Sequence, residues 1–218
     1  MAIEYEFKYK ADENTLGNVS LAFPEKAEII QMETVYFDTP SGAYAQRHYT
    51  LRRRKENDKY ICTLKTPAAE AKKEWEAEVS KKYSHHMAPV FITGSTRNEW
   101  EVECERIEDA FPLLVEKGAP KEVWKLAATE GLKSICGAKF TRIARIVKLR
   151  NSVVELDMDY GFLFGGDKSE PFYELEFEVK SGDKVEAGNF IYKTACQYDL
   201  ELETESKFAR ALKLRSGE

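Results

Sequence analysis

Alternating charged side chains mark the N-terminal segment EYEFKYK as a place where chemistry is possible. A strand with a period of two places Glu4, Glu6 and Lys8 on one face, opposite a face that is aromatic and apolar. Paired carboxylates bind hard divalent cations through oxygen, and lysine and arginine side chains bind phosphate oxygens. Acids and bases on one strand face therefore indicate chemistry on a phosphate compound with the help of a divalent cation.

Charged sets of this kind also occupy one face of nearly every later strand that the sequence predicts. They are Arg52 and Arg54; Thr63 and Lys65; Lys72, Glu74, Glu76 and Glu78; Arg142; Glu155, Asp157 and Asp159; and Glu174, Glu176 and Glu178. For any one strand alone, a solvated outer face is the ordinary interpretation. Like charges on one face repel each other, however, and they favour folding only when ions of the opposite sign lie beside them. We therefore expect these faces to line one central cavity.

A linear triphosphate together with a divalent cation matches the chemistry of such a cavity. Arginine grips phosphate oxygens with two parallel hydrogen bonds, and lysine acts as a point charge. Because carboxylates repel phosphate, their presence beside these bases implies a cation between them, and Mg²⁺ or Mn²⁺ would bridge the two. His85 and His86 have no further ligand at a spacing typical of zinc, so the sequence favours an oxygen-bound metal.

The elements that must position these residues follow from hydrophobic periodicity and turn residues. Strands are predicted at 2–10, 27–37, 48–55, 59–66, 71–83, 138–150, 152–163 and 172–180. Helices are predicted at 12–23, in two pieces between 107 and 132 that are split at Gly118 and Pro120, at 184–198, and at 204–214. A closed barrel with a charged interior, and with apolar strand faces turned outward beneath the helices, satisfies both faces of every strand.

Composition and charge argue against several other classes of protein. The net charge of −5 disfavours nucleic-acid binding, which usually needs a basic surface. No apolar stretch approaches the length of a membrane-spanning helix, so we expect no membrane partner. The four cysteines form no CxxC pair and the N-terminal segment is charged from its start, which favours a cytoplasmic location with reduced thiols.

Nine motifs occur in the order that is typical of one known family. They are EYEFK at 4–8, YFDTP at 36–40, LRRR at 51–54, TLK at 63–65, EWE at 74–76, an arginine-led strand at 142, ELDMDYG at 155–161, ELEFE at 174–178 and ESKFAR at 205–210. The chain resembles the CYTH family, also called triphosphate tunnel metalloenzymes, which includes inorganic triphosphatases, thiamine triphosphatases and class IV adenylyl cyclases. The segment PFYELEFEVKSGD and the KEVW helix look most similar to the bacterial inorganic triphosphatase branch.

The resemblance implies an α+β fold, a closed antiparallel eight-stranded β-barrel with peripheral helices. It is expected as one domain over residues 1–218, with a helical insertion at about 106–132.

The resemblance also implies roles for individual residues. The catalytic residues would be Glu4, Glu6, Lys8 and Glu76. The triphosphate would be held by Lys8, Arg52, Arg54, Lys65, Lys72, Arg142, Lys207 and Arg210. Mg²⁺ or Mn²⁺ would be held by acids among Glu4, Glu6, Glu74, Glu76, Asp159, Glu174, Glu176 and Glu178. Two departures from the family pattern stand out, since Lys72 takes the place of an arginine and Asp157 adds an acid whose role is open.

The implied activity is metal-dependent hydrolysis of inorganic tripolyphosphate to pyrophosphate and phosphate by a monomer or homodimer. One alternative is a thiamine triphosphatase or class IV adenylyl cyclase, in which Trp75, Trp100, Tyr36 or Tyr44 would contact an organic group at the tunnel mouth. Another alternative is a polyphosphate-binding module without catalysis. Glu4 and Glu6 favour an enzyme, because a protein that only binds anions has no use for them.

Overall fold

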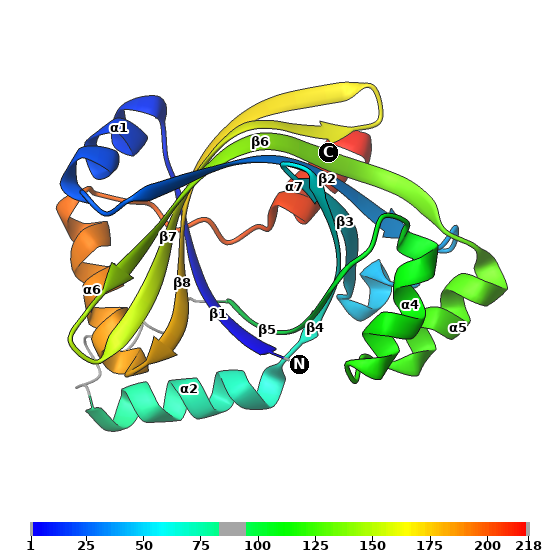
Figure 1. The fold of residues 1–218 in the computed structure, drawn as a ribbon, viewed down its shortest axis with the longest axis horizontal. Coiled ribbons are helices and arrows are strands. Elements are labelled where there is room, and N and C mark those ends of the chain that lie inside the picture. The colour runs from blue at the N-terminus through cyan, green and yellow to red at the C-terminus, as the bar shows by residue number, and fades with distance from the viewer. Residues whose placement is uncertain (1, 83–94, 217–218) are drawn as a thin grey trace.

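Eight strands of the described chain close into an antiparallel barrel (Figure 1). The computed structural model describes residues 2–82 and 95–216. The strands are β1 (Ala2–Lys10), β2 (Ala27–Asp38), β3 (Thr50–Glu56), β4 (Lys59–Pro67), β5 (Ser95–Glu103), β6 (Lys133–Lys148), β7 (Ser152–Gly165) and β8 (Lys168–Gly182). Their order around the barrel is β1-β5-β4-β3-β2-β6-β7-β8, and β8 pairs back with β1. The predicted closed eight-stranded barrel is confirmed.

The strand predicted at 71–83 is wrong, because Ala69–Lys82 form the helix α2. Its place in the barrel, between β4 and β1, is taken by β5. The segment AEAKKEWEAEVSKK consists largely of Ala, Glu and Lys, which favour helix, so the short charge alternation in EWEAE does not decide its structure. In β5 the alternation continues through Trp100 and Val102, both buried, which is typical of a strand with one packed face.

The remaining predicted helices are present with small shifts of their ends. They are α1 (Glu13–Ala22), α4 (Ile107–Glu116), α5 (Lys121–Glu130), α6 (Lys184–Gln197) and α7 (Lys207–Ser216). Asp12 and Asp183 cap the first turns of α1 and α6, where their side chains accept hydrogen bonds from backbone N–H groups. A short 3-10 helix, η1 (Ala45–Arg47), lies between β2 and β3.

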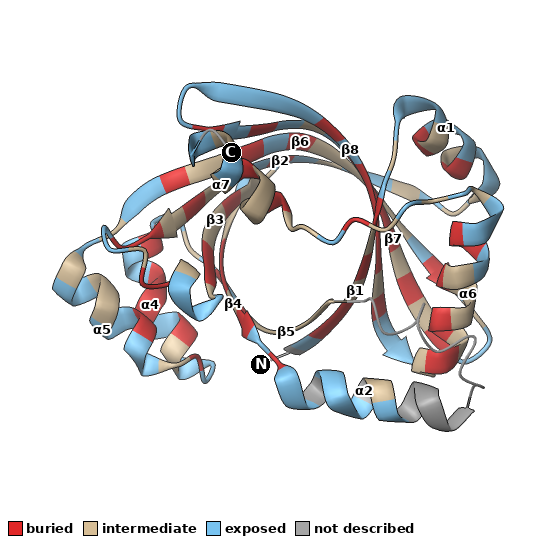
Figure 2. Ribbon diagram, turned by 180° about the vertical axis from the view of Figure 1, so that it is seen from behind, coloured by how far each residue is buried: buried red, intermediate tan, exposed pale blue. Residues whose placement is uncertain are grey.

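The helices α1 and α6 lie on one side of the barrel and α4 and α5 on the opposite side (Figures 1 and 2), and the apolar strand residues pack against them. On one side Phe7, Leu156 and Phe177 belong to a buried cluster with residues of α1 and α6. On the other side Leu64 and Trp100 pack with residues of α4 and α5. A third, smaller cluster joins β6, β7 and β8 to α7. The main hydrophobic cores therefore lie between the barrel wall and its helices, as the strand periodicity predicts.

Charged side chains occupy the inner faces instead. Glu4, Arg54 and Glu176 come from three different strands, are only 8%, 7% and 7% exposed, and line a common central cavity. Within 2–82 and 95–216, no helix has the length and hydrophobicity needed to cross a membrane. His85 and His86 lie outside the described residues.

The outward position of the core leads to a first prediction. Phe177 is fully buried and its ring lies edge-on to those of Tyr9 and Phe190, with centroids 5.9 Å and 6.3 Å away. Phe177→Ala is expected to lower the free energy of unfolding by about 3–5 kcal/mol, because it leaves a cavity beneath α6. Phe162 on β7 is 49% exposed and serves as the matched control, with an expected loss below about 1 kcal/mol. Urea denaturation followed by circular dichroism measures both, and equal losses would contradict the proposed location of the core.

Candidate active site

The barrel surrounds a cavity of about 770 Å³ whose wall is mainly charged. Most of the predicted site residues line it: Glu4, Glu6, Lys8, Arg52, Arg54, Lys65, Lys72, Arg142, Glu176, Glu178 and Lys207. They come from β1, β3, β4, β6, β8, α2 and α7, so the fold brings together residues that are far apart in the sequence. The cavity is the natural candidate for a functional site.

Five other predicted site residues do not line the cavity. Glu74 and Glu76 lie on α2, where Glu74 is exposed and Glu76 is half-buried. The structure therefore does not bring them to the barrel interior. Asp159 and Glu174 are fully buried next to Lys207, which lines the cavity, and Arg210 contacts Glu174. The positions of Glu74 and Glu76 follow from the wrong strand prediction for this segment.

Three cavity residues on β5 were not among the predicted ones, namely Arg97, Glu99 and Glu101. The tripeptide EWE occurs twice in the sequence, at 74–76 and at 99–101, and only the second copy lies on a barrel strand. Arg97 stands two residues before Glu99, which is the spacing expected for the arginine that the sequence analysis placed at Lys72. The longer alternation in RNEWEVE is the sequence signal that distinguishes the second copy from the first.

Some of the cavity charges are well balanced by partners of opposite sign. The Lys65 ammonium donates to both carboxylate oxygens of Glu4 at 2.7 Å and lies 3.1 Å from Glu99. Arg52 lies 3.6 Å from both Glu99 and Glu101. These pairs link β1, β3, β4 and β5 across the cavity wall.

Two arginines differ from these pairs in their surroundings. Arg54 donates to the Thr34 hydroxyl at 3.1 Å, and its nearest carboxylate, Glu56, lies 3.5 Å away. Burial, with Arg52 and Arg142 nearby, lowers the pKa of Arg54. Burial also lowers the pKa of Arg97, although the carboxylates of Glu4, Glu6 and Glu99 oppose this shift. The Arg54 guanidinium in particular would gain from a bound anion.

Two carboxylates on the cavity wall have raised pKa values. Burial raises the pKa of Glu6, and the carboxylates of Glu176 and Glu4 add to this, while Lys8 opposes it from a distance of 3.5 Å. Burial also raises the pKa of Glu178 to about 7 even though Lys180 lies 3.0 Å away. The register places Glu6 directly opposite Glu178 on the neighbouring strand. An all-oxygen set of this kind suits a hard divalent cation such as Mg²⁺ or Mn²⁺.

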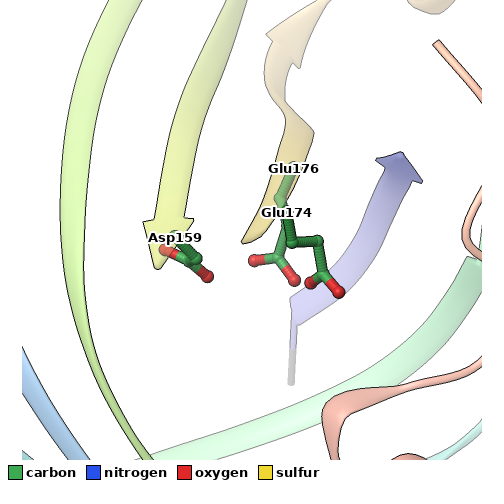
Figure 3. A group of neighbouring side chains, drawn as sticks. All are labelled: Asp159, Glu174 and Glu176. Atoms are coloured by element: carbon green, nitrogen blue, oxygen red, sulfur yellow. The ribbon is translucent and has the colours of Figure 1, made fainter. Parts of the chain in front are cut away.

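A second acidic group lies deeper, where Asp159, Glu174 and Glu176 turn their carboxylates toward one another (Figure 3). Carboxylate oxygens of the three lie within 4.8 Å of each other, which is close enough to hold a metal ion. The Lys207 ammonium contacts all three of them, at 2.9 Å from Asp159 and 2.7 Å from Glu176. Burial alone would raise the pKa of Glu176, but Lys207 and Arg142 hold it well below its usual value.

Asp38 of the YFDTP motif fixes a loop that contacts an arginine of the cavity wall. The buried Asp38 carboxylate accepts hydrogen bonds from the backbone N–H groups of Thr39, Tyr44 and Ala45, at 2.7–3.0 Å. The loop that it fixes ends at His48, whose carbonyl accepts from Arg97 at 2.7 Å. Asp38 thus orients an arginine of the cavity through the loop.

The four aromatic residues expected at the tunnel mouth have different environments. The Tyr44 hydroxyl donates to the Val123 carbonyl at 2.6 Å, and Trp100 packs in the outer core, so neither points to the cavity. Tyr36 lines the cavity. The side chain of Trp75 lies outside what the structure describes.

Comparison with known proteins gives consistent results. The family model of the CYTH domain matches residues 2–212. The chain is 23% identical over 181 residues to an inorganic triphosphatase of Haemophilus influenzae, a match that covers 83% of this chain and 45% of that protein. It is 39% identical over 67 residues to YjbK of Bacillus subtilis, which is provisionally named a triphosphatase, and this match covers 30% of this chain and 35% of YjbK. The matched parts therefore span less than half the length of either relative.

A solved structure extends the comparison to the fold. HpAC1 from Hippeastrum is a proposed adenylyl cyclase described as having a dominant triphosphatase activity. It superimposes with a TM-score of 0.62 and 22% identity, covering 99% of this chain and 96% of HpAC1. At this identity the likeness shows that the two chains share a fold.

The charge deficit around Arg54 yields a second prediction. Arg54→Met removes a buried charge that nearby arginines repel, so the melting temperature of the ligand-free protein should not fall. The same change should abolish the rise in melting temperature that tripolyphosphate produces in the unmodified protein, because the anion loses a ligand. Lys73→Met, at an exposed position on α2 outside the cavity wall, is the control and should retain most of that rise. Differential scanning calorimetry with and without tripolyphosphate measures both effects, and a rise retained in Arg54→Met would contradict an anion site at this residue.

Proposed function

The chain belongs to the CYTH domain family, and from this premise we propose that it hydrolyses inorganic tripolyphosphate to pyrophosphate and phosphate within the barrel. The observation that carries the proposal is the presence in one cavity of a base and an acid whose nearest opposite charges lie 3.5 Å away. The nearest carboxylate to Arg54 is Glu56, and the nearest cation to Glu6 is Lys8. A triphosphate with a divalent metal meets both needs at once, whereas either ion alone meets only one.

The phosphate chain would be held by bases from several strands. Arg54 would contribute the strongest contact, because it is buried near Arg52 and its nearest carboxylate lies 3.5 Å away. Arg97 would add a second contact from β5. Arg52 and Lys65 both pair with Glu99, and they would bind further phosphate oxygens from β3 and β4. Lys8 lies beside Glu6 and can donate to a phosphate oxygen as negative charge moves onto the leaving pyrophosphate.

The metal would be held by Glu6, with Glu4 and Glu178 as further candidate ligands on β1 and β8. When bound, Mg²⁺ or Mn²⁺ neutralises phosphate charge and lowers the pKa of a bound water molecule. In the overall reaction the oxygen of a water molecule bonds to a terminal phosphorus, the bridging P–O bond breaks, and pyrophosphate leaves. The protein's own residues contribute by binding and orienting the phosphates and by keeping the carboxylates close to them.

A second candidate function is hydrolysis of an organic triphosphate. A second cavity of about 570 Å³, lined by the apolar side chains of Phe208 and Leu212 and by Tyr49, adjoins the charged one. The two cavities share His48, Thr50 and Arg97 among their lining residues. An organic group attached to one end of the phosphate chain would have an apolar place to bind there.

The third prediction separates these two functions. Phosphate release should be faster from tripolyphosphate than from thiamine triphosphate or ATP, with either Mg²⁺ or Mn²⁺, because most of the cavity wall is charged. Removal of the metal with EDTA should stop the reaction, and added Mg²⁺ or Mn²⁺ should restore it. A higher kcat/KM for either organic substrate would favour the second candidate, and cyclic AMP formed from ATP would favour cyclisation.

The fourth prediction tests catalysis against simple binding. Glu6→Gln should lower kcat for tripolyphosphate by on the order of 100-fold or more, because the metal loses a ligand, while the circular dichroism spectrum stays unchanged. Glu74→Gln, the same change on the exposed α2, should leave kcat within about twofold. Unmodified protein that binds tripolyphosphate tightly but releases no phosphate with any metal would instead identify a binding module.

A further inference from the structure

We infer that the group formed by Asp159, Glu174 and Glu176, here called the carboxylate cage, is not a metal site in this chain but is filled by the ammonium of Lys207. The sequence predicts these three residues as metal ligands, and their carboxylate oxygens lie close enough together to hold an ion. These oxygens, however, already accept hydrogen bonds from lysine and arginine side chains. This holds whether or not the proposed reaction occurs.

The ammonium has three protons and three carboxylate partners in the cage. Lys207 Nζ lies 2.9 Å from Asp159 Oδ2 and 2.7 Å from Glu176 Oε1, and it also donates to Glu174 Oε1. Figure 3 shows Asp159 and the two glutamates extending from neighbouring strands, with their carboxylates close to one another. A primary ammonium surrounded by three acceptors has its hydrogen bonds satisfied, so it occupies the centre of the cage in the way a metal ion would.

The outer oxygens of the cage are also taken. Arg142 donates to Asp159 Oδ1 at 2.8 Å and to Oδ2 at 2.7 Å, and it contacts Glu176 Oε2 as well. Arg210 donates to Glu174 Oε2. Within the described chain, all six carboxylate oxygens of the cage therefore accept from a cationic side chain. A divalent ion would have to displace groups that are already ion-paired and, in the case of Lys207, only 6% exposed.

The contrast with Glu6 indicates where a metal is expected instead. The nearest cation to Glu6 is Lys8 at 3.5 Å, and the Ser95 hydroxyl lies 3.4 Å away, both longer than the contacts inside the cage. A metal that binds at Glu6 gains a carboxylate that has no close cation. A metal that binds in the cage gains carboxylates only after breaking their existing ion pairs.

The same contacts give Asp157 a role. Its Oδ2 lies 2.5 Å from Arg142 Nη1, so Asp157 completes the set of acids that hold Arg142 against the cage. Arg142 is therefore a positioning residue that ties β6 to β7 and β8, and its guanidinium is directed at carboxylates. Lys207 is the first residue of α7, and its contacts attach the start of this helix to the barrel strands.

The test counts bound Mn²⁺ by electron paramagnetic resonance on the full chain without substrate. Lys207→Met replaces the ammonium with a neutral side chain of similar length, so it should bind one more equivalent of Mn²⁺ than the unmodified protein. Asp159→Asn should not change the count in the unmodified background and should remove the extra equivalent in the Lys207→Met background. Lys213→Met, on the same helix but paired with the half-exposed Glu205, is the matched control and should leave the count unchanged.

Two results would overturn the inference. One is an unchanged Mn²⁺ count in a folded Lys207→Met protein, and the other is loss of an equivalent in Asp159→Asn alone. If Lys207→Met does not fold, Glu6→Gln decides, since it should remove Mn²⁺ binding from the unmodified protein, and an equivalent retained there would place the metal in the cage. Unmodified protein that binds no Mn²⁺ would contradict the proposed metal dependence, whereas a gain in Lys207→Met would still support the filled cage.

Discussion

The structure depends on one electrostatic constraint, which is that acids and bases buried inside a closed barrel must be neutralised by each other or by bound ions. Transfer of an isolated charge from water into a protein interior is very unfavourable. Around Lys207 and Arg142 the chain meets this constraint with its own side chains. Around Arg54 and Glu6 the nearest opposite charges lie 3.5 Å away, and this deficit has both signs within one cavity. We regard this division between a balanced part and an unbalanced part as the physical basis of the candidate site.

The rest of the fold follows from the need to hold these charges inward. Because the inner strand faces are charged, the outer faces must supply the hydrophobic core, and they need helices to cover them. The two pairs α1/α6 and α4/α5 provide that cover on opposite sides of the barrel. The β2–β3 loop also helps to position a cavity residue. The Asp38 carboxylate accepts hydrogen bonds from the loop backbone, and the loop carbonyl of His48 accepts one from Arg97. Residues far from the cavity centre thus determine where its guanidinium groups point.

The sequence predicts well those parts of the fold that depend on local periodicity. EYEFKYK and ELEFEVK alternate over enough residues to identify β1 and β8, and with them the inward direction of Glu4, Glu6, Glu176 and Glu178. It fails at EWEAE because five alternating residues inside an Ala-, Glu- and Lys-rich segment are compatible with an exposed helix as well as a strand. It also cannot distinguish balanced from unbalanced charges. Whether Arg142 faces phosphate or Asp157 depends on strand register, and whether Lys207 enters the cage depends on how α7 docks, and neither is a property of a single segment.

The charge balance of the cavity also bears on the choice between an enzyme and an anion-binding module. Among the described residues, eleven acidic and nine Lys or Arg side chains line the cavity. A wall with more acids than bases does not attract a free polyanion on charge alone, in spite of Arg54 and Arg97. Such a wall favours an anion that arrives with divalent cations, which neutralise phosphate charge and bind carboxylates together. A bound metal would then strengthen phosphate binding, and a metal that contacts both carboxylate and phosphate would also be in the position from which it can assist hydrolysis. The excess of acids therefore argues for catalysis more strongly than the bases argue for binding.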